Sequence, residues 1–364
     1  MRRLLYLFMF LGCLTCKSTV MPEPPVTLPA TQSFWVGTYT DDTGSEGIYR
    51  FELSREGQLR KIGLASPASN PSYLTYANNG RSVIAVNENQ DGTVEAFRVN
   101  NDQLLSTSQS ESGGAHPCHV QADAAGNVLA ANYTGGNVGL LTISAKGILS
   151  ELLDTQDHTG TTGQTPHAHA SYADPKTDNK IAVDLGTDAL WLSRVRGGQF
   201  IFAKPRTLAL DTGAGPRHAA FHPNGKWLYV INEYANTVTR VTRGVAGYRK
   251  GPSVSTLPPD FAGESFCADV HLSSDGKYLY GSNRGHNSIA VFAIDPRTGD
   301  LRLLANEPVR GDWPRNFTLS PAGRYLLVAN QRSNNIVAFR RDATTGLLDY
   351  VSEIAAPAPV CLLF

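Results

Sequence analysis

The sequence predicts an all-β protein, a seven-bladed β-propeller with four antiparallel strands in each blade. Three observations support this prediction. Six segments of the 364-residue chain repeat one pattern, at intervals of roughly 45 to 50 residues, a spacing typical of repeat architectures. Each segment contains short alternating strands separated by turns, without helical periodicity. The two ends of the chain contain complementary parts of a seventh copy.

The repeated unit is clearest in the copy that begins at Pro216. A short apolar strand is followed by a Pro-Asn-Gly turn, the strand KWLYVIN, a polar turn and a third alternating strand. A fourth, looser strand ends each copy, as in QLLSTSQSES or DLRLLANEPVR. The other copies begin at Asn70, His116, Pro166, Ser265 and Trp313. Four short antiparallel strands per copy indicate a propeller blade, although the WD and kelch signatures are absent.

The chain termini are predicted to complete the ring. The segments FWVGTYT, GIYRFEL and QLRKIGLAS resemble the second, third and fourth strands of a blade, with no first strand before them. The final segment PVCLLF (359–364) matches the first-strand pattern of the other copies. We therefore expect the C-terminal strand to complete the N-terminal blade, which removes an exposed sheet edge. The propeller is expected to occupy residues 34–364.

The first 33 residues have a different character. Arg2 and Arg3 precede an apolar run that is too short to span a bilayer and is typical of a secretory signal. The stretch LGCLTC, with Cys13 and Cys16, resembles a bacterial lipoprotein processing site, and a plain signal peptide is the alternative. We expect a lipoprotein-type signal peptide over 1–16 and a Pro-rich tether over 17–33. The protein is then exported to the periplasm or outer membrane, where a lipid anchor is its only membrane contact.

Charge and cysteine content limit the classes of partner. Lys and Arg number 32, as do Asp and Glu, so the net charge is zero, which argues against a nucleic-acid partner. Beyond the signal only Cys118, Cys267 and Cys361 remain, an odd number that leaves at least one thiol free. Each lies in an apolar strand-like segment and is expected to pack as a small core residue rather than form a disulfide or a metal site. The oligomeric state does not follow from the sequence.

The blade topology brings two sets of residues to one mouth of the central channel. The first strand of a blade lies nearest the axis and the second returns beside it, so the start of the first and the end of the second meet there. The first set is Ser72, Cys118, His169, Arg217, Ala268 and Arg315. The second set is Asn87-Glu88, Asn132-Tyr133, Asp184-Leu185, Asn232-Glu233, Asn283-Arg284 and Asn330-Gln331.

Purely structural roles account for part of this arrangement. Asn and Asp side chains cap backbone amides in turns, which suits most of the second set. Arg217 and Glu233 are also compatible with an ion pair that ties two strands of one blade. These roles leave His169 and Arg284 of other blades unexplained at the same mouth, where buried charges are costly unless they are paired or used.

Four longer segments carry a resemblance to a known family. They are VGTYTDDTGSEGIYRFEL, the unit PHAH…DLGTD, GPRHAAFHPNGKWLYVINE and SNRGHNSIAVF. They resemble the seven-bladed lactonase family, which includes a bacterial 6-phosphogluconolactonase and fungal carboxy-cis,cis-muconate cyclases, over essentially all of 34–364. The resemblance implies a catalytic site of one His, two Arg and one Glu at the channel mouth. By motif these residues are His169, Arg217, Arg284 and Glu233.

Lactone hydrolysis needs a base that activates water and donors that stabilise an oxyanion. Glu233 or His169 is the candidate base, and Arg217 and Arg284 are candidates to hold the oxyanion or a substrate anion. The candidates for substrate binding are Arg315, His167, Glu88 and Asn132. No G-x-S-x-G elbow is present, so an acyl-enzyme is not expected. Arginines beside the site would repel a dication, so neither a catalytic metal nor another cofactor is expected.

The leading interpretation is metal-independent hydrolysis of a sugar-derived lactone, of the 6-phosphogluconolactonase type. Because an exported protein meets few sugar phosphates, an unphosphorylated aldonolactone is the alternative native substrate. One alternative is a cyclase or lactonising enzyme that acts on a dicarboxylate. Another is a non-catalytic propeller that binds a sugar acid or a protein at the cell surface, because propellers have many roles.

Overall fold

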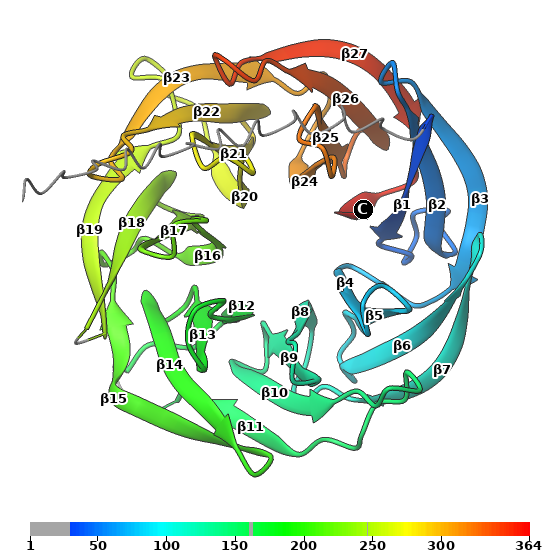
Figure 1. Ribbon diagram of the computed structural model, residues 1–364, viewed down its shortest axis with the longest axis vertical. Coiled ribbons are helices and arrows are strands. Elements are labelled where there is room, and N and C mark those ends of the chain that lie inside the picture. Colours follow the sequence, from blue (N-terminus) through cyan, green and yellow to red (C-terminus); the bar gives the residue numbers. More distant parts are fainter. Residues whose placement is uncertain (1–29, 160–162, 246) are drawn as a thin grey trace, which may run out of the picture.

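The structure, a computed structural model, describes residues 30–159, 163–245 and 247–364. Within these ranges seven four-stranded antiparallel sheets surround a central axis (Figure 1), which confirms the predicted seven-bladed propeller. The expected signal peptide, with Cys13 and Cys16, and residues 17–29 of the expected tether lie outside the described residues. No helix long and apolar enough to cross a membrane occurs in the described part of the chain.

The strands are grouped by their position in the blade, from the axis outward. The innermost strands are β4 (Leu74–Ala77), β8 (Pro117–Ala122), β12 (Ala168–Ala173), β16 (Pro216–Phe221), β20 (Phe266–Leu272), β24 (Pro314–Leu319) and β28 (Pro359–Leu363). The second strands are β1 (Thr31–Thr38), β5 (Ser82–Asn87), β9 (Asn127–Asn132), β13 (Asn179–Asp184), β17 (Trp227–Asn232), β21 (Tyr278–Arg284) and β25 (Tyr325–Asn330). The third strands are β2 (Gly47–Ser54), β6 (Thr93–Asn100), β10 (Asn137–Thr142), β14 (Ala189–Arg196), β18 (Thr237–Gly244), β22 (Ser288–Ile294) and β26 (Asn335–Arg341). The outermost strands are β3 (Leu59–Pro67), β7 (Gln103–Glu111), β11 (Asp154–Asp157), β15 (Gln199–Ala209), β19 (Gly247–Ser255), β23 (Leu301–Pro308) and β27 (Leu348–Ala355).

Both ends of the chain build one blade. Its strand order is β28-β1-β2-β3, and β28 pairs antiparallel with β1, with Val36 opposite Leu362 and Gly37 opposite Cys361. The predicted closure of the ring by the C-terminal strand is therefore confirmed. β1 begins at Thr31, before the expected boundary at residue 34, because its first residues already pair with the end of β2.

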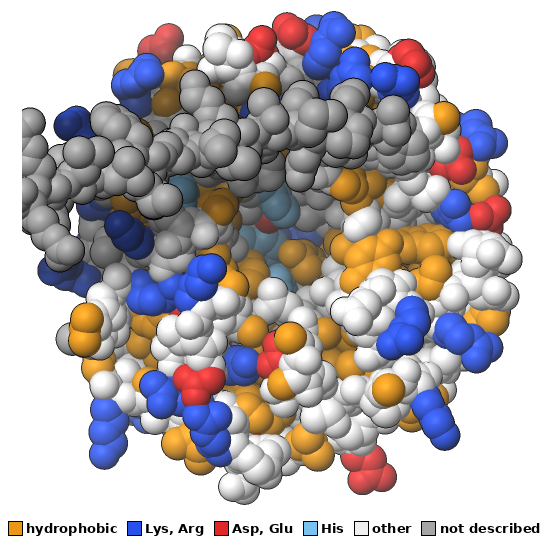
Figure 2. Space-filling model, viewed as in Figure 1, with side chains coloured by type: hydrophobic (Ala, Val, Ile, Leu, Met, Phe, Trp, Pro, Cys, Tyr) orange, Lys and Arg blue, Asp and Glu red, His pale blue; other side chains and the backbone are white. Residues whose placement is uncertain are grey.

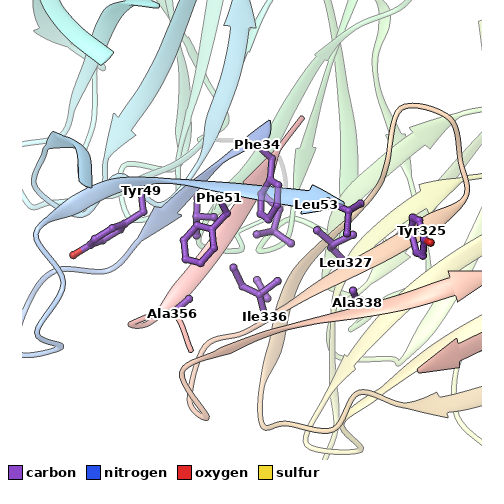
Figure 3. Packing of buried hydrophobic residues seen from close by; sticks show 12 residues of the cluster. Phe34, Tyr49, Phe51, Leu53, Tyr325, Leu327, Ile336, Ala338 and Ala356 are labelled. Atoms are coloured by element: carbon purple, nitrogen blue, oxygen red, sulfur yellow. The ribbon is translucent and has the colours of Figure 1, made fainter. Parts of the chain in front are cut away.

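Apolar side chains fill the interfaces between neighbouring blades. Figure 3 shows one of them, where Phe34 and Phe51 of the terminal blade face Leu327 and Ile336 of the blade before it. Similar clusters lie between each other pair of adjacent blades. Because both faces of a blade are covered, second strands such as β17 and β25 are buried along their whole length. The core is thus spread around the ring, and polar side chains can occupy the axis.

The innermost strands are irregular where they approach the channel mouth. The pairing of β16 with β17 skips Arg217, so that Pro216 lies opposite Asn232 and His218 opposite Ile231. The corresponding pairings skip Cys118 in β8, His169 in β12, Arg315 in β24 and both Ala268 and Asp269 in β20. Such β-bulges change the direction of a side chain. As a result, consecutive residues line one narrow cavity at the axis, as Arg217 and His218 do, and likewise Arg315 and Asn316.

Candidate functional site

Glu233 joins the two predicted catalytic arginines. Its Oε2 atom lies 3.0 Å from Arg217 Nε and 2.9 Å from Arg284 Nη2. The contact with Arg217 Nε is ionic rather than a well-aligned hydrogen bond. The arginine side chains are only 2% and 6% exposed, whereas the Glu233 side chain is 15% exposed. The structure therefore brings together residues from the end of β17, the bulge of β16 and the end of β21.

Both arginines donate hydrogen bonds to backbone carbonyl oxygens of β20. Arg217 Nη1 donates to the Ala268 carbonyl oxygen (2.6 Å), and Arg284 donates from Nε and Nη2 to the carbonyl oxygens of Phe266 and Cys267. Among the described residues, no acceptor contacts Arg217 Nη2 or Arg284 Nη1. Burial, and then the charge of Arg217, lowers the pKa of Arg284 to about 10, so this group remains a cation at neutral pH. Each arginine thus keeps one terminal nitrogen for a ligand.

His169 is a neutral imidazole at the same mouth. The residue is 4% exposed, and burial, followed by the positive charge of Arg217, holds its pKa well below 6.5. Its Nδ1 atom lies 3.7 Å from the Cys118 sulfur, whereas Nε2 has no partner in the described ranges. Cys118 itself is a buried thiol whose pKa is raised by burial, which makes it a poor nucleophile. His169 can therefore accept a proton at Nε2.

Two of the expected substrate-binding residues form a second charged pair. Arg315 Nη2 lies 3.9 Å from Glu88 Oε1, which is a loose contact. Tyr39 donates a hydrogen bond to Glu88 Oε2 (2.9 Å), and the Arg315 guanidinium stands 5.3 Å from the centre of its ring. Tyr39 was absent from the sequence prediction. Tyr39 directly follows β1, which is the second strand of the terminal blade. An alignment of VGTYT with the second strands of the other copies would therefore have found it.

Aromatic rings surround this mouth. His167, one of the candidates for substrate binding, stacks on Tyr133 with ring centres 4.6 Å apart, and its Nδ1 contacts the Tyr133 carbonyl oxygen. The indole of Trp313 stands 5.2 Å from the Arg284 guanidinium and 3.4 Å from that of Arg332. Trp313 has a φ of +66°, which is unusual for so large a side chain. Its backbone is held there by Asn287, whose Oδ1 accepts from Trp313 N.

Asn132 does not lie with these residues. Its side chain is completely buried, and its Nδ2 atom donates to the Ser112 carbonyl oxygen and to Asn137 Oδ1. The structure thus places this expected substrate-binding residue inside its blade, because the amide links the second strand to the third. Asp184 has the predicted capping role, since it accepts from the backbone N–H groups of His167 and Thr187.

The sequence prediction missed a further row of polar side chains, here called the second row, which lies next to the first set of channel residues. It contains Tyr73, His119, His218, Asp269 and Asn316, each one residue after a member of the first set. Histidine side chains are visible deep in the central hollow (Figure 2). His218 and Asp269 share a 2.8 Å hydrogen bond. Strict alternation predicts that the residue after a channel residue points away, and the bulges overturn that expectation.

The charge of the mouth suits an anionic or developing negative group. Arg217, Arg284 and Arg315 face Glu88 and Glu233, which leaves one net positive charge. In the part of the chain that the structure describes, no three His, Cys, Asp or Glu side chains are grouped as metal ligands would be. Cys118, Cys267 and Cys361 are buried free thiols, as expected for packing residues. The arrangement can provide a neutral base beside two guanidinium donors.

Comparison with known proteins supports the resemblance noted in the sequence. The family described as "Lactonase, 7-bladed beta-propeller" matches residues 33–364. The chain belongs to this family. A 6-phosphogluconolactonase of Bacillus subtilis is 35% identical over 342 residues, which cover 91% of this chain and 97% of that protein. One of Formosa agariphila is 33% identical and covers 79% and 86%, respectively. Among solved structures, a periplasmic gluconolactonase of Pseudomonas aeruginosa is 30% identical, with a TM-score of 0.86 and coverage of 91% and 98%.

Acid is expected to destabilise this member of the lactonase family through its buried histidines. Burial holds the pKa values of His119 and His169 well below 6.5 and lowers that of His218 to about 4. The unfolded chain binds protons at these sites near pH 6.5, whereas the folded chain does not. The free energy of unfolding should therefore be largest above that pH and fall below it, by up to about 1.4 kcal/mol per pH unit for each such histidine. His271 opposes this in part: burial lowers its pKa, but the charge of Asp269 and the hydrogen bond to Asp269 together outweigh burial and raise the pKa.

Urea denaturation between pH 8 and 5 measures the effect. The variant His119→Gln serves as the matched control, because it removes one of the neutral histidines and should reduce the slope. If the free energy of unfolding stays constant or rises as the pH is lowered from 7 to 5, the buried histidines are not neutral as expected.

Proposed function

We propose that the protein hydrolyses a sugar-derived lactone, of the 6-phosphogluconolactonase type, by metal-independent activation of water. The observation that carries the proposal is that neutral His169 lies near two buried arginines that each keep a free terminal nitrogen: its ring centre is 5.2 Å from that of His218, which contacts Arg217. The names of the similar proteins from Bacillus subtilis and Pseudomonas aeruginosa support the same substrate class.

His169 acts as the general base in this proposal. Its Nε2 atom takes a proton from water as the water oxygen attacks the carbonyl carbon of the lactone. A base must be unprotonated at working pH and have a free acceptor atom, and His169 meets both conditions, although burial and Arg217 lower its pKa and with it its strength as a base. Glu233 is less suitable, because its Oε2 atom already contacts the guanidinium groups of Arg217 and Arg284.

The arginines stabilise the charge that develops on the carbonyl oxygen. Arg217 Nη2 and Arg284 Nη1 donate to the tetrahedral oxyanion in a poorly solvated site, where such donors are most effective. When the intermediate collapses, the bond between the carbonyl carbon and the ring oxygen breaks. The ring oxygen takes the proton from the His169 imidazolium, and the product is an open-chain acid. Glu233 keeps the two like-charged guanidinium groups close together.

We also propose that the physiological substrate is an unphosphorylated aldonolactone. This follows from the expected export of the chain, since sugar phosphates are cytosolic metabolites. The net positive mouth can bind the carboxylate product, and Arg315 is the candidate contact for it. A dication would meet the three guanidinium groups there, which is the reason to propose catalysis without a metal.

A panel of lactones tests the reaction and the substrate together. Gluconolactone, its 6-phosphate and a carboxylated muconate are offered in the presence of a chelator, and proton release or loss of the muconate is followed. Hydrolysis of either gluconolactone above the uncatalysed rate supports the reaction, and a higher kcat/KM for gluconolactone than for its 6-phosphate supports the unphosphorylated substrate. The reverse preference would overturn the substrate proposal. Activity on the muconate alone would favour a cyclase, and no turnover of any compound would favour a binding protein.

Arg217→Lys is expected to lower kcat/KM by about 100-fold, since loss of one oxyanion donor typically costs that much. Lysine keeps the charge but lacks the planar fork, so it cannot contact Glu233, Ala268 and an oxyanion at once. Steady-state kinetics and the melting temperature are measured together. The matched control is Arg340→Lys on β26, an exposed arginine, which should change neither. Parental kinetics in Arg217→Lys would remove Arg217 from the proposed mechanism.

A further inference from the structure

Asp269 is an ionised carboxylate buried at the axis. It is 2% exposed, and although burial raises its pKa, the neighbouring His271 and His218 hold the pKa well below 3.8. Oδ1 accepts from His218 Nδ1 (2.8 Å), and Oδ2 accepts from Asn316 Nδ2 (2.6 Å) and contacts His271 Nε2 (3.1 Å). A buried charge of this kind is costly, and complete hydrogen bonding is what makes it tolerable.

The carboxylate determines which nitrogen of His218 carries the proton. Because ionised Asp269 can only accept, the 2.8 Å bond requires a hydrogen on Nδ1. Burial, and then Arg217, keep the His218 ring neutral, with a pKa of about 4. Nε2 therefore carries a lone pair, and this atom lies 3.4 Å from Arg217 Nη1. In the opposite tautomer two N–H groups would face each other.

The contact completes the set of scaffold bonds on Arg217. Nη1 donates to the Ala268 carbonyl oxygen (2.6 Å) and faces His218 Nε2, while Nε contacts Glu233. These contacts restrict rotation of the guanidinium plane. We propose that Asp269 and His218 are positioning residues, which direct Arg217 Nη2 toward the reacting carbonyl oxygen. The inference rests on the proposed function and adds two residues from the second row to it.

A simpler role must be separated from this one. Asp269 accepts from β16 and β24 as well as from its own strand, so it also ties three blades together. If that were its whole contribution, changes to His218 would lower stability and leave the catalytic step unchanged. The two roles are distinguished by measuring kcat and the melting temperature of the same variant: a positioning role lowers kcat, whereas a purely structural role lowers only the melting temperature.

Two replacements of His218 divide its hydrogen bonds. Asparagine places an amide where Nδ1 was, so it can still donate to Asp269 but cannot reach Arg217. Glutamine places its amide near Nε2 and can still accept from Arg217. We expect His218→Asn to lower kcat by about 10- to 100-fold, because small misplacements of a catalytic group have effects of this size, with little change in KM. His218→Gln should recover most of that loss.

His119→Asn is the matched control. His119 is equally buried and its ring centre lies 5.6 Å from that of His218, but it forms no hydrogen bond with Arg217. It should lower the melting temperature and leave kcat unchanged. Parental kcat in His218→Asn, or equal losses in both His218 variants, would overturn the inference. Arg217→Ala is measured alongside the His218 variants. If Arg217→Ala retains full activity, the proposed function fails. If Arg217→Ala is inactive while both His218 variants keep the parental kcat, only the positioning role fails.

A spectroscopic test observes the tautomer in the parent protein directly. Two-bond ¹H–¹⁵N spectra of the parent protein at pH 7 distinguish the two neutral tautomers of histidine, and the spectrum of either His218 variant identifies the His218 signals by their loss. The Nδ1–H tautomer is expected. An Nε2–H tautomer or a cationic ring would present a donor to Arg217 and would contradict the proposal.

Discussion

With glutamine in place of His169, kcat for lactone hydrolysis is expected to fall by about 100- to 10,000-fold, the usual contribution of general-base catalysis. Glutamine keeps a polar group of similar reach at the mouth but cannot take a proton from water. Since the site is buried and His169 is neutral and lacks a partner at Nε2, the fold and substrate binding should change little. The pH–rate profile of the parent should have its acid limb well below pH 6.5, so rates are measured from pH 8 down to the lowest pH at which the protein stays folded, and the variant should lack this limb.

Glu233→Gln is the matched comparison for His169→Gln. An amide at 233 no longer neutralises Arg217 and Arg284, so we expect a higher KM, a lower melting temperature and a smaller loss of kcat. If Glu233→Gln instead loses the acid limb and more of kcat than His169→Gln does, Glu233 is the base. Parental turnover in both variants would remove this site from consideration.

Deletion of residues 359–364 is expected to unfold the protein or to lower its melting temperature drastically. The deletion removes β28, and with it the buried side chains of Val360, Cys361 and Leu362. Burial of such side chains contributes about 1.5–3 kcal/mol each, and the whole stability of a domain is about 5–15 kcal/mol. The truncated chain also exposes the edge of β1, which invites aggregation. Thermal unfolding and light scattering measure both effects.

Removal of Phe364 alone provides the control for this deletion. Phe364 lies beyond β28 and is only partly buried, with its ring 5.0 Å from that of Phe34. Its removal should lower the melting temperature far less than the six-residue deletion does. A truncated protein that retains the melting temperature of the full chain would contradict the role of β28 in closing the ring.

Repetition explains how much of the fold was predictable. Each copy carries its own strands and turns, so six weak patterns reinforce one another, and the unmatched ends such as PVCLLF imply closure. The two sets of residues at the channel mouth followed from the same alignment, because equivalent positions in the blades meet at the axis. His169, Arg217, Arg284 and Glu233 were found in this way, and the family comparison agrees with the resemblance that they carry.

The direction and atomic partners of individual side chains were beyond this reasoning. Asn132 shares its place in the repeat with Asn232, and only the structure shows that both amides donate to the scaffold and not to a ligand. Likewise, the alignment placed Glu233 and His169 at one mouth without choosing a base. The choice depends on two guanidinium groups converging on one carboxylate oxygen, and on the burial that keeps the imidazole neutral.

The sequence by itself determined the number of blades, the ring closure and the residues nearest the mouth, because these depend on a repeated alternation of apolar and polar positions. Tertiary structure alone decided that His218 and Asp269 also face the axis and that Arg217 has one free terminal nitrogen. The physical reason is the β-bulge, in which one unpaired residue shifts the register locally. Such a shift leaves no mark in the alternation, because it depends on how the inner strand pairs with the second strand of its blade.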